Sequence, residues 1–413
     1  MLKFRTAYIF IASLFFFLLA TQGTFFPDDY YIADEATSSE ANLFFLIFWP
    51  VAFTILALVT WARRPARSKL PISLWIMLGA VALSILFSEL PAVSARRGLA
   101  LFLSVGCAVF LVKAAKDPEE IISGLYWGLS PLVVLSVGGA LLFPSHAVHY
   151  ASPDLIGDWK GVFSHKNFTA YAACITLLIS FHRLRTGGLK LSTLSIFLLS
   201  ALLMAKANSL FMFLMAPICY LAAAAMAAKS RASKIYVKMI GIGALLIMVP
   251  IAILTMYFPR WPELLGTTLN NRTEIWSTLL SAQSGREILG HGFGAVHNVG
   301  ENSVFWKYGE WRIQTLGHGH SGQLDVYAAT GIIGWAATNL FLFSRMTRLN
   351  ISAKGPSRHQ GLVCAFLAWI VITRSFVESN LLSTGRLDWF LCCLSILALF
   401  RWYNPRDTSD QPG

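Results

Sequence analysis

The sequence predicts an all-α fold, a polytopic transmembrane helical bundle of about twelve spans. Of its 413 residues, 56% are apolar and only 13% are charged, whereas a soluble domain carries about a quarter charged residues. No soluble core needs so much apolar surface, so lipid must surround most of the chain. A further indication is the regular alternation of apolar runs with short basic segments.

Twelve apolar runs are candidate membrane spans, because a span needs about 20 mostly apolar residues. Lys3 and Arg5 precede the first run as in a signal peptide, but no small-residue cleavage site follows, so we expect an uncleaved first helix. The fourth and sixth runs are short. The runs lie near 7–26, 42–61, 71–88, 98–112, 121–143, 168–182, 189–204, 209–228, 235–258, 323–344, 361–377 and 387–403.

The lysines and arginines concentrate in alternate connecting segments, and this predicts the orientation. With twelve spans, all of these segments and both basic termini fall on one side, which the positive-inside rule identifies as the cytoplasm. An error of one helix would put strongly basic loops on both sides. The basic segments lie at 63–69, 113–116, 183–190, 229–238 and 345–358.

The net charge of +12 raises the possibility of a nucleic-acid partner. The basic residues lie in short loops between apolar spans, where they set orientation and contact anionic headgroups. We therefore expect membrane lipids as partners and no nucleic acid.

We expect residues 1–413 to form a single integral membrane domain without a separate soluble part. The segment 259–322 is too long for a mere connector and is rich in Gly, Trp, His and Asn, so we expect a large periplasmic loop that contains short helices. Seven of the nine histidines fall on this side, which indicates that it is the working face. They are His146, His149, His165, His291, His297, His318 and His320.

The first polar motif runs from Gly161 to Asn167, directly before the sixth apolar run. Lys166 would lie at the membrane surface with His165 and Asn167 as donors on either side. Two interpretations stay open: an anion-binding corner for a phosphate, or a snorkelling lysine beside a helix cap made by Asn167 or Thr169.

The second motif begins at Asn271, which forms a capping-box pattern with Glu274. An apolar stripe at helical spacing follows, so we expect a short helix that lies on the membrane and ends near Gly285. Arg272 at its start could hold a diphosphate bidentately or could simply contact headgroups. The stripe consists of Ile275, Trp276, Leu279 and Leu280.

The third motif is the glycine- and histidine-rich segment 317–322, which opens the tenth run. Its glycines allow the backbone to approach a ligand closely. A histidine there could remove a proton from a sugar hydroxyl. Alternatively, His318 and His320 could be metal ligands, although two histidines without a nearby cysteine or carboxylate cluster make a weak site, or they could be purely structural.

Further charged residues near helix ends on this side are either membrane anchors or site residues. Arg374 and Glu378 are one helical turn apart, so we expect them to form a structural ion pair. The others are Arg96, Arg97, Lys206 and Arg386.

Taken in order, these segments resemble the O-antigen ligase and exopolysaccharide polymerase family. Residues 161–167 match its Gly-x-Phe-x-His-Lys-Asn pattern, and Arg272, Thr273 and Trp276 match its Arg-Thr/Ser-x-x-Trp stretch. Residues 290–294 are similar to a Gly-x-Gly-Phe-Gly turn, and 88–97 resembles a family stretch with arginine. The His-Asn/Ser-x-x-Leu and Gly-hydrophobic-hydrophobic-Gly motif is matched by His320, Ser321, Leu324, Gly331, Ile332, Ile333 and Gly334.

The sequence departs from the family pattern at two positions. Ser321 stands where ligases often have Asn, and Ala329 stands where many members have Glu. The His-Ser-Gly-x-Leu-Asp stretch is closer to the exopolysaccharide branch, which favours a polymerase over a ligase.

The resemblance implies glycosyl transfer at the periplasmic face of a bacterial inner membrane. The donor would be a glycan on undecaprenyl diphosphate, and the acceptor would be a second glycan or a lipid core. His320 would take the hydroxyl proton, and Arg272 with Arg97, Lys166, His165 and Asn167 would bind the substrate. The resemblance implies neither cofactor nor metal, and it suggests chain-length regulator and flippase proteins as further partners.

Two rival functions remain. A ligase would transfer the glycan to a lipid A core. A small-solute transporter could also use twelve spans and a glycine-rich segment. Transporters bind near the bilayer midplane, whereas the polar motifs here cluster at one surface and no half-to-half repeat is visible.

Overall fold

The computed structural model describes residues 2–22, 39–65, 69–150, 155–226, 272–311, 313–346 and 356–403, with four isolated residues between 226 and 272. Within these ranges the chain forms α-helices and no β-strand, which confirms the all-α class. The helices are α1 (Leu2–Thr21), α2 (Ser39–Arg63), α3 (Ile72–Leu86), α4 (Pro91–Ala114), α5 (Pro118–Leu142), α6 (Pro144–Ala147), α7 (Lys166–Gly187), α8 (Leu191–Lys206), α9 (Leu210–Met226), α11 (Arg272–Ser281), α12 (Val304–Tyr308), α13 (Gly322–Met346), α14 (Pro356–Arg374) and α15 (Leu387–Trp402).

Eleven of the twelve apolar runs coincide with a helix, and the run near 235–258 lies outside the described residues. Within the described residues, five helices are long and apolar enough to cross a membrane, namely α1, α2, α4, α5 and α13, and α3, α8 and α9 are apolar but shorter. The structure therefore supports a multi-pass helical membrane protein. The described helices do not reach the predicted count of twelve spans. The other helices on these runs are too short or, like α7, carry polar residues near both ends.

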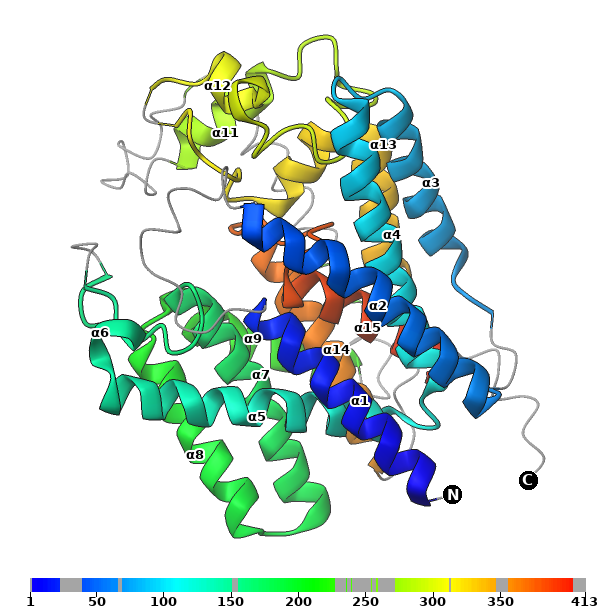
Figure 1. Cartoon of the computed structure of the whole chain (residues 1–413), viewed down its shortest axis with the longest axis vertical. Coiled ribbons are helices and arrows are strands. Elements are labelled where there is room, and N and C mark those ends of the chain that lie inside the picture. The colour runs from blue at the N-terminus through cyan, green and yellow to red at the C-terminus, as the bar shows by residue number, and fades with distance from the viewer. Residues whose placement is uncertain are drawn as a thin grey trace.

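The outer surface of the bundle exposes large apolar side chains. Trp61 and Leu191 are 77% and 79% exposed, and Phe10 and Leu141 are 68% exposed. A water-soluble monomer rarely shows so much contiguous apolar surface, so these side chains face lipid. In the interior, α14 and α15 pack together and are buried along most of their length, behind α1 and α2 in Figure 1.

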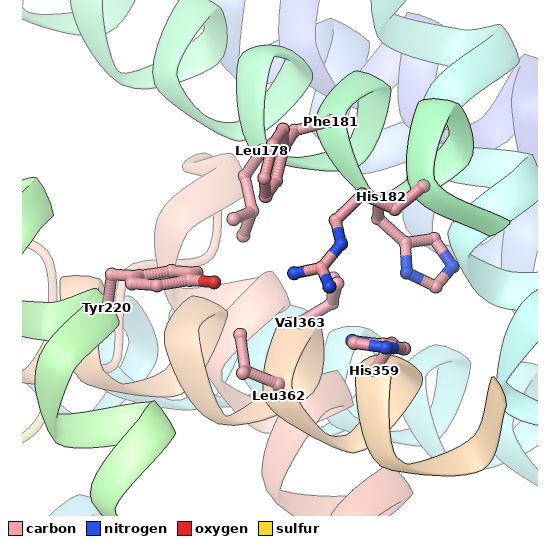
Figure 2. A pocket seen from close by; sticks show the side chains of 8 residues that line it. Leu178, Phe181, His182, Tyr220, His359, Leu362 and Val363 are labelled. Atoms are coloured by element: carbon pink, nitrogen blue, oxygen red, sulfur yellow. The ribbon is translucent and has the colours of Figure 1, made fainter. Parts of the chain in front are cut away.

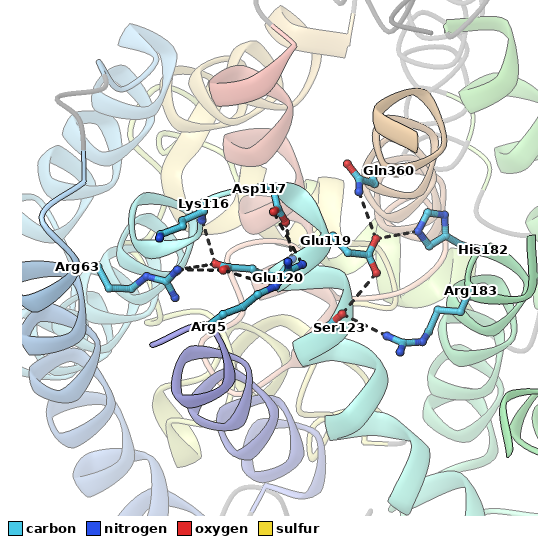
Figure 3. Close-up of polar contacts among 10 residues, drawn as sticks. All are labelled: Arg5, Arg63, Lys116, Asp117, Glu119, Glu120, Ser123, His182, Arg183 and Gln360. Carbon is cyan, nitrogen blue, oxygen red and sulfur yellow. Dashed lines mark hydrogen bonds and ion pairs between the residues drawn. The ribbon is translucent and has the colours of Figure 1, made fainter. Parts of the chain in front are cut away.

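One end of the bundle carries a network of ion pairs between helix ends (Figure 3). Arg63 at the end of α2 lies 2.9 Å from Glu120 at the start of α5, and both side chains are almost fully buried. Glu119 on α5 contacts His182 on α7 and Gln360 on α14. The orientation predicted from the sequence puts these helix ends on one side of the membrane. In the structure they lie close together (Figure 3). We call this end the basic end.

Helix α13 is broken at Gly331, whose φ of 62° and ψ of −168° are not helical. A Cβ atom at this position would collide with the backbone of Ile288. The amide of Ile332 donates to the carbonyl of Glu287 at 2.8 Å, so the break lets the preceding loop dock on the helix. The predicted span at 323–344 is therefore a kinked helix.

The described part of the large loop contains α11, α12 and a short 3-10 helix at Gly300–Asn302, as predicted. The prediction that α11 lies on the membrane is wrong. Its apolar stripe, which includes Trp276 and Leu279, is buried against Phe305 and Leu324, so the loop has a small core of its own. The helix ends at Ser281, and the predicted cap residue at 271 lies outside the described residues.

Candidate functional site

At the end of the bundle opposite the basic end, three sequence motifs meet at Glu378, two at its carboxylate and one at its backbone carbonyl. Asn167 Nδ2 donates to Glu378 Oε1 at 3.2 Å, although the two residues are 211 positions apart. The same oxygen lies 3.7 Å from a guanidinium nitrogen of Arg272. The Gly322 amide donates to the Glu378 backbone carbonyl at 2.9 Å. This bond holds the segment that carries His320 next to Glu378. We define the outer polar cluster as Asn167, Arg272, His318, His320, Glu378 and Arg386.

The backbone at His320 is strained, because its φ of 51° lies in the left-handed region that residues other than glycine rarely adopt. Its ring packs edge-on against His318, with the ring centres 4.2 Å apart. Trp276 Nε1 donates to the Gly319 carbonyl at 3.0 Å, and the Gly319 amide donates to Asp325 Oδ1 at 3.0 Å. The surrounding contacts thus hold His320 in a conformation it would not adopt alone.

The pKa of His320 is lowered from its usual 6.5, mainly because burial disfavours the charged ring, and the charges of Arg272 and Arg386 act in the same direction. Glu378 opposes them only in part. The pKa of His318 lies well below 6.5, mainly because of burial, and Arg386 and His320 act in the same direction. Within the described residues, the buried Nδ1 atoms of both rings have no hydrogen-bond partner. His320 is therefore a neutral imidazole at pH 7 that can accept a proton.

Arg97 reaches this region indirectly. Its guanidinium donates to the backbone carbonyls of Gly294, His297 and Asn298, the last two at 2.8 and 2.7 Å. His297 Nε2 in turn lies 2.9 Å from Asp325 Oδ1, the oxygen that also accepts from the Gly319 amide. Arg97 therefore braces the loop beside the histidines, and its predicted contact with a diphosphate stays a prediction.

Lys166 lies in a compact polar corner next to the cluster. Its ammonium is 2.5 Å from Asp158 Oδ2, and Asn208 donates to the other oxygen of that carboxylate at 3.1 Å. The Lys166 amide donates to His149 Nε2 at 3.2 Å. Asp158 therefore balances the charge of Lys166. The sequence did not predict this pair.

The cap of α7 differs from the predicted one. His165 is the capping residue, since its Nδ1 accepts from the Asn167 amide at 3.1 Å. Asn167 and Thr169, the alternative caps in one of the two interpretations of this motif, both lie inside the helix. The Asn167 side chain is therefore available for Glu378 and for Ser209, whose hydroxyl donates to Asn167 Oδ1 at 3.3 Å.

The predicted ion pair between Arg374 and Glu378 is wrong. Helix α14 ends at Arg374, so Glu378 does not lie on the next regular turn. Arg374 instead pairs with Asp388 of α15 at 3.4 Å, where both side chains are buried. Glu378 lies near Arg272 instead. The only signal in the sequence for this role was a carboxylate near a helix end on the side predicted to be periplasmic.

The cluster combines cations with a neutral histidine. Arg386 donates to the Ser379 carbonyl at 2.8 Å and lies over the Phe168 ring, and its charge acts on both His318 and His320. Among the described residues, no group of three or more His, Cys, Asp or Glu side chains could hold a metal ion. The arrangement is suited to holding an anion beside a proton acceptor.

No model of a known protein family matches the chain, and no curated protein sequence matches it. The family resemblance thus depends on the motifs themselves, three of which supply residues of the outer polar cluster.

Proposed function

We propose that the chain is a membrane glycosyltransferase of the polymerase type, which joins undecaprenyl-diphosphate-linked oligosaccharides in exopolysaccharide or O-antigen synthesis. The observation that supports this best is the position of His320, a neutral histidine on strained backbone. It lies within the electrostatic reach of Arg272, Arg386 and Glu378. A glycosyl donor with a diphosphate leaving group needs these two elements, a proton acceptor and fixed cations.

In the proposed reaction, an acceptor hydroxyl attacks the anomeric carbon of the donor sugar. The new glycosidic C–O bond forms as the bond to the diphosphate breaks, and the hydroxyl proton passes to His320. The lipid diphosphate leaves with the electron pair, and Arg272 offsets its charge. One terminal nitrogen of Arg272 faces Glu378, and the planar guanidinium has further donors for phosphate oxygens.

The proposal puts the outer polar cluster at the periplasmic face of the inner membrane and the basic end in the cytoplasm. It requires an even number of crossings, and we propose twelve, with one of them at 235–258. The buried pairs at the basic end, such as Arg63 with Glu120, join segments that this topology puts on one side.

The test uses the full chain, purified in detergent and supplied with an undecaprenyl-diphosphate oligosaccharide. We expect a ladder of longer lipid-linked products, which is lost in His320→Ala. Transfer only to an added lipid A core would favour the ligase function. Uptake of small solutes into proteoliposomes without any joined product would favour a transporter and contradict the proposal.

A further inference from the structure

A shallow, open hollow lies between α7, α9 and α14 (Figure 2). It is at the basic end, because His182 belongs both to its lining and to the ion-pair network of Figure 3. One part of the lining is apolar and the other part is polar. The lining residues are Leu178, Phe181, Leu362, Val363, His182, Arg185, Tyr220 and His359.

His182 has a hydrogen-bonding atom without a partner in the described part of the chain. The residue is only 4% exposed, and its Nε2 contacts Glu119 Oε2 at 3.0 Å, while its buried Nδ1 has no hydrogen bond. Figure 2 shows one ring nitrogen turned to the hollow and the other turned away. Gln360 donates to the same Glu119 oxygen at 3.3 Å and fixes the pair. The contact of Nε2 with Glu119 leaves Nδ1 as the ring atom that a ligand in the hollow would contact.

The other polar groups of the lining are a cation and hydrogen-bond donors, which favour an anionic ligand. Arg185 contributes a permanent cation, and His359 contributes a second imidazole. The Tyr220 hydroxyl points into the hollow from the side opposite His182 in Figure 2. None of the lining residues is a carboxylate. An anion would therefore find several donors here, and the carboxylate of Glu119, which does not line the hollow, is held by His182 and Gln360.

The apolar part of the lining indicates that the anion belongs to an amphiphile. Phe181 is 40% exposed, and Leu178, Leu362 and Val363 line the hollow with it. The sequence predicts the basic end in the cytoplasm, where anionic lipids attract arginine and lysine side chains.

We propose that this hollow binds the phosphate headgroup of an anionic phospholipid of the cytoplasmic leaflet, with its acyl chains along the exposed apolar side chains. Arg185 and His182 contact the phosphate, and Phe181 contacts the chains. The inference is independent of the proposed glycosyl transfer, because it concerns the opposite end of the bundle.

The test is a titration of the full chain in detergent with phosphatidylglycerol, followed by native mass spectrometry. Arg185→Gln and His182→Gln should each weaken the tightest lipid-binding event about tenfold, as expected for the loss of one charge-assisted contact. The matched control is Arg64→Gln, which removes an exposed arginine at the end of α2, outside the hollow. This variant should bind within about twofold of the wild type.

Further arms of the titration separate the possible ligands. Phosphatidylcholine should bind more weakly than phosphatidylglycerol, and inorganic phosphate at equal concentration should not displace the lipid. Equal losses in Arg185→Gln and Arg64→Gln, or no loss in Arg185→Gln, would overturn the proposal. Displacement by inorganic phosphate alone would identify a free-anion site instead of a lipid site. Because Arg185 is exposed, its variant decides the outcome even where His182→Gln fails to fold.

Discussion

Replacement of Arg272 by lysine separates a diphosphate clamp from a membrane anchor. The guanidinium lies 3.7 Å from Glu378 and is 24% exposed. Lysine keeps the positive charge, so most of the attraction to Glu378 is retained. A single ammonium cannot present the planar pair of donors with which arginine could face Glu378 and a phosphate together. The variant therefore loses about one charged hydrogen bond, roughly 2–3 kcal/mol.

A loss of this size lowers the rate about 30- to 150-fold. The assay measures the initial rate of glycan joining by the purified chain, with the amount of folded protein matched. The control is Arg286→Lys, because Arg286 pairs with Glu89 at 3.2 Å in the same loop but lies outside the outer polar cluster. Near-normal activity of Arg272→Lys, or an equal loss in the control, would refute the clamp and reduce Arg272 to an anchor.

Three other predictions follow from the structure. His320→Ala should abolish product and His318→Ala should be milder, because only His320 is the proposed proton acceptor; the reverse order in the same assay would show that the base is misassigned. Because the pKa of His320 is lowered from 6.5 and only the neutral ring accepts a proton, kcat/KM should fall on acidification with its midpoint below pH 6.5; a midpoint above pH 6.5 would contradict this. Arg63→Gln should destabilise the chain by about 3 kcal/mol in thermal unfolding, because the buried Glu120 loses its nearest cation and keeps the Lys116 amide at 2.9 Å and Arg5 at 4.0 Å; an unchanged transition would show that the pair is dispensable.

Much of the helical framework could be predicted from hydrophobic runs, because a span is a local property of about 20 residues. The run 121–143, for example, corresponds to α5 at Pro118–Leu142. The kink in α13 could not be predicted in this way. Glycine at position 331 permits a break, but only the docking of Ile288 against it requires one.

In the outer polar cluster, the sequence motifs indicated the histidines and Arg272 but not Glu378. The predicted substrate residues Arg97 and Lys166 lie beside this cluster and not in it. Motif order pointed to Arg272, His320 and Asn167, and the structure brings these three residues to one region. The role of Glu378 depends on a contact across 211 positions, which no local pattern encodes. The stripe of α11 was misread for a similar reason, since amphipathic spacing predicts a buried face without indicating whether lipid or protein covers it.

We propose above that the outer polar cluster transfers a glycan from a lipid diphosphate. The most direct measurement counts, in one reaction of the purified chain, the glycosidic bonds formed and the undecaprenyl diphosphate released. Glycosyl transfer by this cluster predicts one released carrier for each bond formed, with both quantities lost together in His320→Ala. Bond formation without carrier release, or carrier release that persists in His320→Ala, would contradict it.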